Sequence, residues 1–210
     1  EGAENVDSNT GHFQGPKFSA GVPEIRAFVR YKADRNDIKK GTEIKSYESF
    51  VADSSFFSIF SFPLINGNPN TALKAPKSVV ISEKMAEQHF GTTEALGKTL
   101  LVKDSFGEGG QFEPYTVTGV SKNCPQNSSI KFDVLFPNVV SKQEIESNEN
   151  WFNVFQNTFV VLQPNADLKK VESTMNRIYQ ADAKEAIKMI AEKYGDKNKV
   201  VYALQPFTDI

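Results

Sequence analysis

The segment from Gly91 to Thr99 is the closest match in this chain to a motif that could bind phosphate. A P-loop reads G-x-x-x-x-G-K-[ST], and its backbone amides cradle the phosphates that the Lys also reaches. Here five residues separate Gly91 from Gly97, where a P-loop has four. The segment also follows a predicted helix and leads into a predicted strand, so no helix N-terminus would stand behind a phosphate. We therefore expect a glycine-rich corner and no nucleotide site.

The remaining reactive side chains stand alone in the sequence. His12 and His89 have no metal-ligand spacing, and His89 lies near a predicted helix end, where the helix dipole favours a partly exposed imidazole. Cys124 is the single cysteine and has no nearby His or CxxC partner to lower its pKa. Carboxylates are plentiful, but no spacing singles out an acid-base pair. We predict no catalytic, cofactor-binding or metal-binding residues, no cofactor and no enzymatic activity.

Composition limits the class of protein further. The 210 residues carry 24 Lys and Arg against 26 Asp and Glu, and this net charge of −2 argues against nucleic-acid binding. Hydrophobic residues make up 39%, including 17 Phe, which is enough for one sizeable core or two small ones. No run approaches the roughly 18 apolar residues of a membrane span. We expect a soluble piece of about one to two domains, with both ends cut from a longer protein.

Hydrophobic periodicity predicts a mixed α/β fold around these residues. Alternating or continuous apolar runs predict strands at 24–31, 44–51, 78–81, 98–103, 113–120, 131–136, 157–162 and 199–204. Apolar residues three and four apart predict helices at 56–60, at 82–90 and from about 167 to 194. We expect a loose arm at the N-terminus and a mobile hairpin loop at 104–110. Phe56, Phe57, Phe60 and Phe62 favour core packing, with a hydrophobic ligand surface as the alternative.

Seven segments, in this order, give the chain a family resemblance. They are 23–30 (PEIRAFVR), 53–67 (DSSFFSIFSFPLING), 76–91 (PKSVVISEKMAEQHFG), 95–100 (ALGKTL), 115–120 (YTVTGV), 125–133 (PQNSSIKFD) and 204–210 (LQPFTDI). Together they resemble the periplasmic core domain of MacB-like ABC transporter permeases, in the FtsX-related family. Asn123 and Cys124 depart from the residues that this family commonly carries before the Pro-x-Asn-Ser segment.

The resemblance implies a particular division of the chain. The family's domain has a porter-like βαβ subdomain with an inserted, mainly β subdomain called the sabre. On this sequence, the resemblance places a flexible arm at 1–22, the porter-like α/β subdomain at 23–70 plus 150–210, and the sabre-like insertion at 71–149.

The resemblance also implies a function without bond chemistry. The chain would be the segment between the first and second membrane helices of an inner-membrane permease, on the periplasmic side. It would pass on ATP-driven movement from a separate cytoplasmic ATPase to export or extract an envelope substrate. Its partners would be that ATPase, the permease's membrane helices, a second copy of the permease and an adaptor protein. The cargo is not implied, and a stand-alone periplasmic ligand-binding protein or hydrolase, or a membrane-anchored sensor domain, is the alternative.

Overall fold

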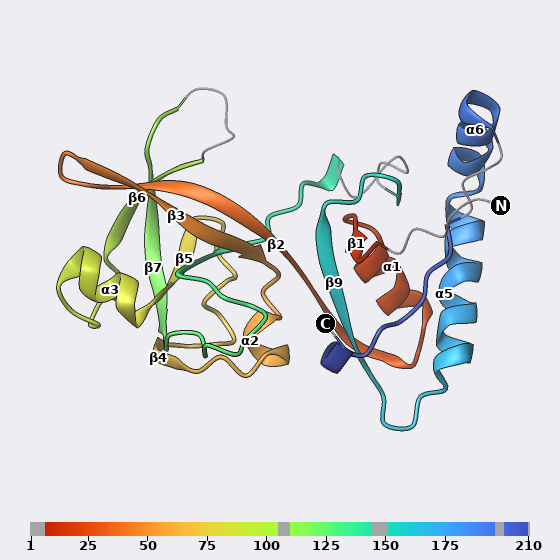
Figure 1. Cartoon of the computed structure of the whole chain (residues 1–210), viewed down its shortest axis with the longest axis horizontal. Helices are drawn as coiled ribbons and strands as arrows, with labels where there is room; N and C mark the ends of the chain where they lie inside the picture. Colours follow the sequence, from red (N-terminus) through yellow and green to blue (C-terminus); the bar gives the residue numbers. More distant parts are fainter. Residues whose placement is uncertain (1–6, 105–109, 144–150, 196–199, 210) are drawn as a thin grey trace. The chain divides into compact units, whose positions relative to one another are not determined.

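The computed structural model describes residues 7–104, 110–143, 151–195 and 200–209, which form two compact units (Figure 1). Unit 1 comprises Glu1–Phe28 and Val140–Ile210, and unit 2 comprises Val29–Val139. Most of the predicted loop at 104–110 lies outside the described residues. The chain contains both helices and strands, so the predicted mixed α/β class is confirmed.

Unit 2 is built on a closed ring of strand pairings. Its strands are β2 (Ile25–Lys40), β3 (Glu43–Ala52), β4 (Leu64–Gly67), β5 (Ser78–Ser82), β6 (Thr99–Asp104), β7 (Glu113–Ser121) and β8 (Val134–Pro137). Pairing runs from β2 through β3, β8, β5, β7 and β6 back to β2, and β4 pairs with β7 outside this ring. A closed ring leaves its member strands with few unpaired edges. Strand β4 was not predicted.

Apolar side chains from this ring form the main core of unit 2. The cluster comprises Ile38, Val79, Ile81, Met85, Ala86, Ala95, Leu100, Val102, Val117, Val120, Val134 and Phe136. Met85 and Ala86 come from α3 (Glu83–Phe90), whose N-terminus is capped by the Ser82 side chain and whose C-terminus ends at Gly91. This helix was predicted because its cap, apolar face and terminating glycine are all local in the sequence.

The phenylalanine cluster packs inside unit 2 around α2 (Phe56–Ile59). Phe56 is fully buried and its ring lies within 6 Å of the rings of Phe57, Phe60, Phe62 and Phe132. Phe57 is 8% exposed. The prediction of core packing is therefore confirmed for this cluster, and its alternative as a ligand surface is not supported.

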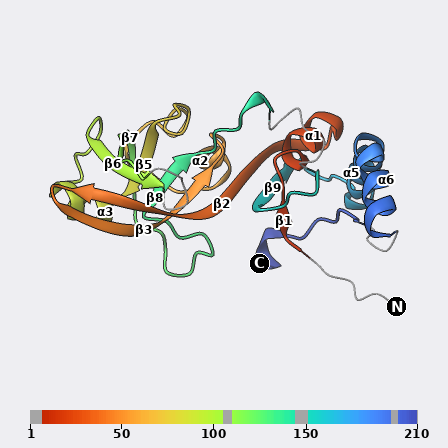
Figure 2. The same ribbon diagram turned by 90° about the horizontal axis from the view of Figure 1, so that it is seen from above.

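Unit 1 packs helices on a small sheet. It contains β1 (Asn9–Thr10), α1 (Gln14–Gly21), β9 (Gln156–Leu162), α5 (Leu168–Asp182), α6 (Lys184–Tyr194) and the short helix η2 (Phe207–Asp209). Figures 1 and 2 both place α1 between β9 and α5. A side chain at Gly15 would meet Phe28 and Thr158, and one at Gly21 would meet Ile178, so α1 sits close to both neighbours. The aromatic core of this unit surrounds Trp151, which is 1% exposed.

Three expectations for unit 1 need correction. The predicted loose arm at 1–22 is wrong for residues 14–21, which form α1 and bury Phe18 in the aromatic core. The long helical stretch is two helices that meet at Ala183. The described part of the predicted strand at 199–204 pairs with no strand, and the backbone of Tyr202 bonds instead to the Asn176 side chain on α5.

The division into units also differs from the predicted boundaries. Residues 29–70 were assigned to the porter-like part, whereas their contacts place them in unit 2. The physical reason is strand pairing, because β2 and β3 pair with β6 and β8 of the predicted insertion. The names porter and sabre for the two parts stay a prediction.

Candidate functional site

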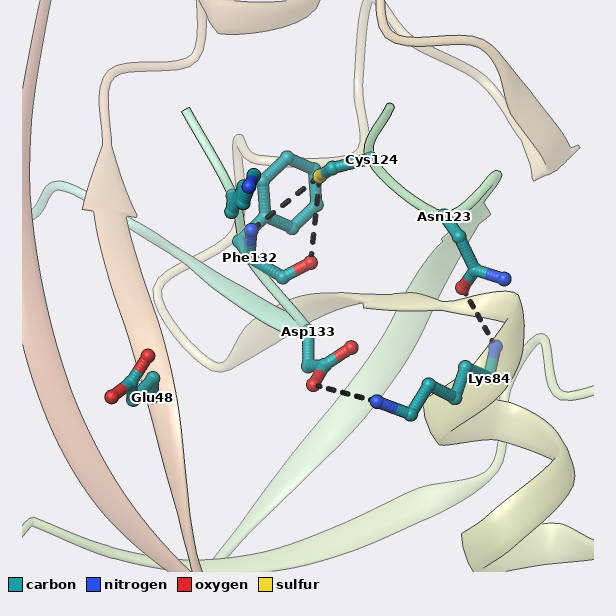
Figure 3. Close-up of a pocket in the computed structure, with 7 residues that line it drawn as sticks. Glu48, Lys84, Asn123, Cys124, Phe132 and Asp133 are labelled. Atoms are coloured by element: carbon teal, nitrogen blue, oxygen red, sulfur yellow. Dashed lines mark hydrogen bonds and ion pairs between the residues drawn. The ribbon is translucent and has the colours of Figure 1, made fainter. Parts of the chain in front are cut away.

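A small open hollow in unit 2 is lined by charged side chains and by the single cysteine of the chain (Figure 3). Its volume is about 250 Å³. The lining comes from β3, the first turn of α3, the segment after β7 and the segment before β8. The residues are Glu48, Lys84, Asn123, Cys124, Lys131, Phe132 and Asp133.

The N-terminus of α3 fixes one wall of this hollow. The Ser82 hydroxyl accepts a hydrogen bond from the Met85 amide at 3.1 Å and donates one to the Asp133 carboxylate at 2.9 Å. Asn123 accepts from the Lys84 amide at 3.1 Å, and its own amide donates to the Glu83 carboxylate at 3.1 Å. The bonds from the Lys84 and Met85 amides satisfy donors that the first turn of a helix leaves unpaired, so both amides already have partners.

Cys124 also lines the hollow and is held by the backbone of Phe132. The Phe132 amide donates to Sγ at 3.4 Å, and the thiol donates back to the Phe132 carbonyl at 3.6 Å, as Figure 3 shows. Burial raises the pKa of the Cys124 thiol above its usual range. Because the thiolate is the reactive form, Cys124 is a weak nucleophile at neutral pH.

The charges of the hollow nearly cancel. The lining contains two carboxylates, Glu48 and Asp133, and two lysines, Lys84 and Lys131. Lys84 Nζ lies 4.0 Å from the Asp133 carboxylate, and both side chains are largely exposed, so this ion pair contributes little. Within the described ranges, no three His, Cys, Asp or Glu side chains form a group that could hold a metal ion. This arrangement selects neither an anion nor a cation.

The glycine-rich corner has the form that its sequence predicts. Gly91 ends α3 with a positive φ of 73°, and its amide donates to the Glu87 carbonyl at 2.8 Å. Gly97 has a φ of 75°, and its amide donates to the Val117 carbonyl at 2.8 Å, just before β6 begins. Both glycine amides are therefore engaged within the chain.

The two histidines lie in different units. The His12 ring packs against Phe155 with ring centroids 4.7 Å apart. His89 is partly buried in the last turn of α3. Partial burial and, to a lesser extent, the nearby charge of Lys40 lower the His89 pKa, which opposes the dipole effect that its position predicts.

A second polar arrangement lies in the core of unit 1, and we call Gln14, Glu172, Asn176 and Tyr202 the end-fastening network. Gln14 is fully buried. Its side-chain oxygen accepts from the Gly11 amide at 2.8 Å, and its nitrogen donates to the Trp151 carbonyl at 3.2 Å and to the Tyr202 hydroxyl at 2.9 Å. One side chain thus bonds segments from both ends of the chain.

The side chains of α5 hold the C-terminal segment in this network. Asn176 accepts from the Tyr202 amide at 2.8 Å and donates to the Tyr202 carbonyl at 2.7 Å, as a neighbouring strand would. Glu172 accepts from the Leu204 amide at 2.8 Å. Burial raises the pKa of Tyr202 to about 12, so its hydroxyl stays a proton donor or acceptor at any ordinary pH.

Sequence reasoning missed the end-fastening network. Gln14 lies in a stretch without periodicity, and Asn176 is one of several polar residues in an amphipathic helix. The alternation at 200–204 predicted an extended segment but could not reveal that its partners are side chains on α5. The sequence contains no local signal for such long-range pairs.

Comparison with known proteins agrees with the predicted family and with the mixed α/β fold. The family model described as the MacB-like periplasmic core domain matches residues 6–178. The chain therefore belongs to this family, the periplasmic domains of MacB- and FtsX-like ABC transporter permeases. A search of curated proteins gives no match.

Solved structures share the fold at low sequence identity. A domain of a putative permease protein from Porphyromonas gingivalis has 19% identity and a TM-score of 0.73, with 99% of this chain and 87% of that chain covered. The periplasmic region of MacB from Actinobacillus actinomycetemcomitans has 12% identity and a TM-score of 0.57, with 92% and 86% covered. The extracellular domain of the ABC-type transporter YknZ from Gram-positive bacteria has 18% identity and a TM-score of 0.53, with 96% and 91% covered.

The length and polarity of a helix decide whether it could cross a membrane. Across the ranges that the structure describes, each helix is too short or too polar to cross a bilayer.

Proposed function

We propose that this chain transmits ATP-driven movement in an ABC permease, as the periplasmic segment between its first and second membrane helices. A separate cytoplasmic ATPase supplies the energy, and the domain itself makes and breaks no covalent bonds. Movement of the membrane helices shifts the outer domains and so expels or extracts a substrate already outside the inner membrane. Different binding energies in two domain arrangements drive this work.

The observation that carries the proposal is the end-fastening network of unit 1. Gln14 bonds to Gly11 near one end of the chain and to Tyr202 near the other. If each end continues into a membrane helix, displacement of either helix acts on one shared core. A buried hydrogen-bonded network resists local deformation, because an unpaired polar group inside the core costs free energy. A core of this kind suits a domain that transmits conformational change.

The hollow of unit 2 gives little support to the alternative of a stand-alone binding or sensor protein. Ligand sites are usually enclosed, mostly apolar and fitted with a few convergent polar groups. This hollow is open, and its charges nearly cancel. We therefore place cargo and adaptor contacts outside the hollow, in an assembly that contains two permease copies.

Photo-cross-linking in cells tests the proposal. A photoreactive residue is placed in the full-length protein at Leu96 in unit 2 or at Val201 in unit 1, which are 48% and 62% exposed. Phe57 serves as a buried control position because it is only 8% exposed. We expect capture of a second permease copy, an adaptor or an envelope substrate, with a pattern that changes when the ATPase is inactivated. An identical pattern with active and inactive ATPase would favour the sensor or binding protein.

A further inference from the structure

The chain passes between the two units at two places. On the unit 2 side of each crossing, a polar residue is hydrogen-bonded to Asp53. The crossings lie between Phe28 and Val29 and between Val139 and Val140. Arg30 comes just after the first crossing, and Asn138 comes just before the second. Both residues bond to Asp53, which directly follows β3. We call Arg30, Asp53 and Asn138 the Asp53 clamp.

The carboxylate of Asp53 uses both oxygens in this clamp. Oδ2 accepts hydrogen bonds from the Arg30 amide and from Arg30 Nε, each at 2.8 Å. Oδ1 accepts from Arg30 Nη2 at 2.7 Å and from Asn138 Nδ2 at 3.1 Å. The Arg30 and Asp53 side chains are only 10% and 12% exposed. Paired, charge-assisted bonds of this kind are the strong class of hydrogen bond, and they fix geometry as well as distance.

Backbone hydrogen bonds add to the Asp53 clamp. The Asp53 amide donates to the Arg30 carbonyl at 3.0 Å, and the Asn138 amide donates to the Ala52 carbonyl at 2.7 Å. In the sheet, Ala52 lies opposite Tyr31 on β2 and opposite Pro137 on β8. The clamp therefore continues the three-strand ladder by one more residue, through side chains as well as backbone.

We propose that the Asp53 clamp makes both crossing segments rigid parts of unit 2. Any bending between the units then takes place on the unit 1 side of the clamp. That side lies before Arg30 on the first connection and after Asn138 on the second. Val139, the residue after the clamp, is 61% exposed, which agrees with a change in packing at this point. A force carried by either connection enters unit 2 at the same place, the end of β3. This inference concerns the chain itself and stands independently of the proposed transport function.

Amide hydrogen exchange on the 210-residue chain tests the clamp. Asn138→Ala removes the side-chain bond to Asp53 while leaving the Arg30 and Asp53 pair intact. We expect the amides of residues 53 and 138 to exchange about tenfold faster in this variant, because local opening becomes easier. The matched control is Asn66→Ala, which removes a half-buried bond from Asn66 to the Thr93 carbonyl elsewhere in unit 2. The control should leave exchange at residues 53 and 138 unchanged.

A second variant removes the charge at the centre of the clamp. Asp53→Asn keeps the size of the side chain but removes the negative charge that pairs with the buried Arg30 guanidinium. We expect faster exchange at residues 30, 53 and 138 together, with the ring core of unit 2 still protected. Unchanged exchange at the crossings in Asn138→Ala would overturn the proposal. Equal acceleration across all of unit 2 in Asn138→Ala would overturn it too, because the bond would then serve general stability.

Discussion

Gln14 is a fully buried polar side chain that makes three hydrogen bonds, to the Gly11 amide, the Trp151 carbonyl and the Tyr202 hydroxyl. These bonds offset the cost of burying its amide. Replacement by Leu keeps the volume close and removes the three bonds. The Tyr202 hydroxyl and the Gly11 amide lose their partner inside the core.

We predict that Gln14→Leu lowers the free energy of unfolding by about 1–3 kcal/mol, since buried polar groups without partners cost this much. Urea unfolding of the 210-residue chain measures the loss. Gln180→Leu on the exposed side of α5 is the control and should change the free energy by less than about 0.5 kcal/mol. Equal effects of the two substitutions would contradict the role of Gln14.

Deprotonation of Tyr202 at high pH removes its contribution to the stability of the end-fastening network. Its pKa is about 12 in the folded chain, above the ordinary value of 10. A raised folded-state pKa means that the stabilising contribution is complete below pH 10 and is lost as the pH rises through 12. We predict that unfolding free energy falls more steeply over this window in the wild type than in Tyr202→Phe. Ultraviolet titration of tyrosinate, compared between the two proteins, measures the same pKa. Parallel stability curves would contradict burial as the cause.

Protonation of His89, in the last turn of α3, makes the stability of the folded chain depend on pH in the acid range. Its pKa is lowered from 6.5 by partial burial and then by the charge of Lys40. With a lowered folded-state pKa, the unfolded chain binds the proton more readily, so stability is complete above about pH 6.5 and falls as the pH drops below it. We predict that His89→Gln shows a smaller loss of thermal stability between pH 7 and 5. If the variant lost as much as the wild type, other groups would cause the acid sensitivity.

At the scale of elements, α3 depends on its N-terminal cap. Ser82 accepts from the Met85 amide and also donates to Asp133, so it joins the helix to the segment before β8. We predict that Ser82→Ala lowers the free energy of unfolding by about 0.5–2 kcal/mol, the usual range for a lost cap. Chemical denaturation measures it, with exposed Ser173→Ala on α5 as the control. A cost no larger than that of the control would show that the helix does not rely on this cap.

The contrast between α3 and α1 explains how much of the fold the sequence predicts. In α3 the cap, the apolar face and Gly91 are consecutive, so local rules suffice. Helix α1 has no side-chain cap bond, and its buried Gln14 bonds to residues more than 130 positions away. The phenylalanine cluster was predicted correctly because dense aromatic residues favour a core in nearly any fold. The end-fastening network depends on long-range pairs, which no short window of sequence contains.

The division into units shows a second limit of prediction. Strand β2 runs for 16 residues without a break, yet its first four residues belong to unit 1 and the rest to unit 2. A continuous strand carries no composition change or turn residue at this boundary, and the family resemblance implies a boundary near residue 70 instead. The clamp at Arg30 and Asn138 marks the boundary physically, but its members are far apart in the chain.

At the scale of the molecule, both ends of the chain belong to unit 1, and the chain passes from unit 1 into unit 2 and back. Under the proposed function, movement of the membrane helices would reach unit 2 through its connections to unit 1. The account therefore predicts that the two units change their arrangement when the ATPase binds ATP.

Pulsed electron paramagnetic resonance on the full-length permease with its ATPase measures this directly. Nitroxide labels are attached at Leu96 in unit 2 and Met189 in unit 1, which are 48% and 57% exposed, in a background with Cys124→Ser. We predict that the distance distribution between the labels shifts when an ATPase that binds but does not hydrolyse ATP is given the nucleotide, and returns when nucleotide is removed. Superimposable distributions in both states would contradict the account.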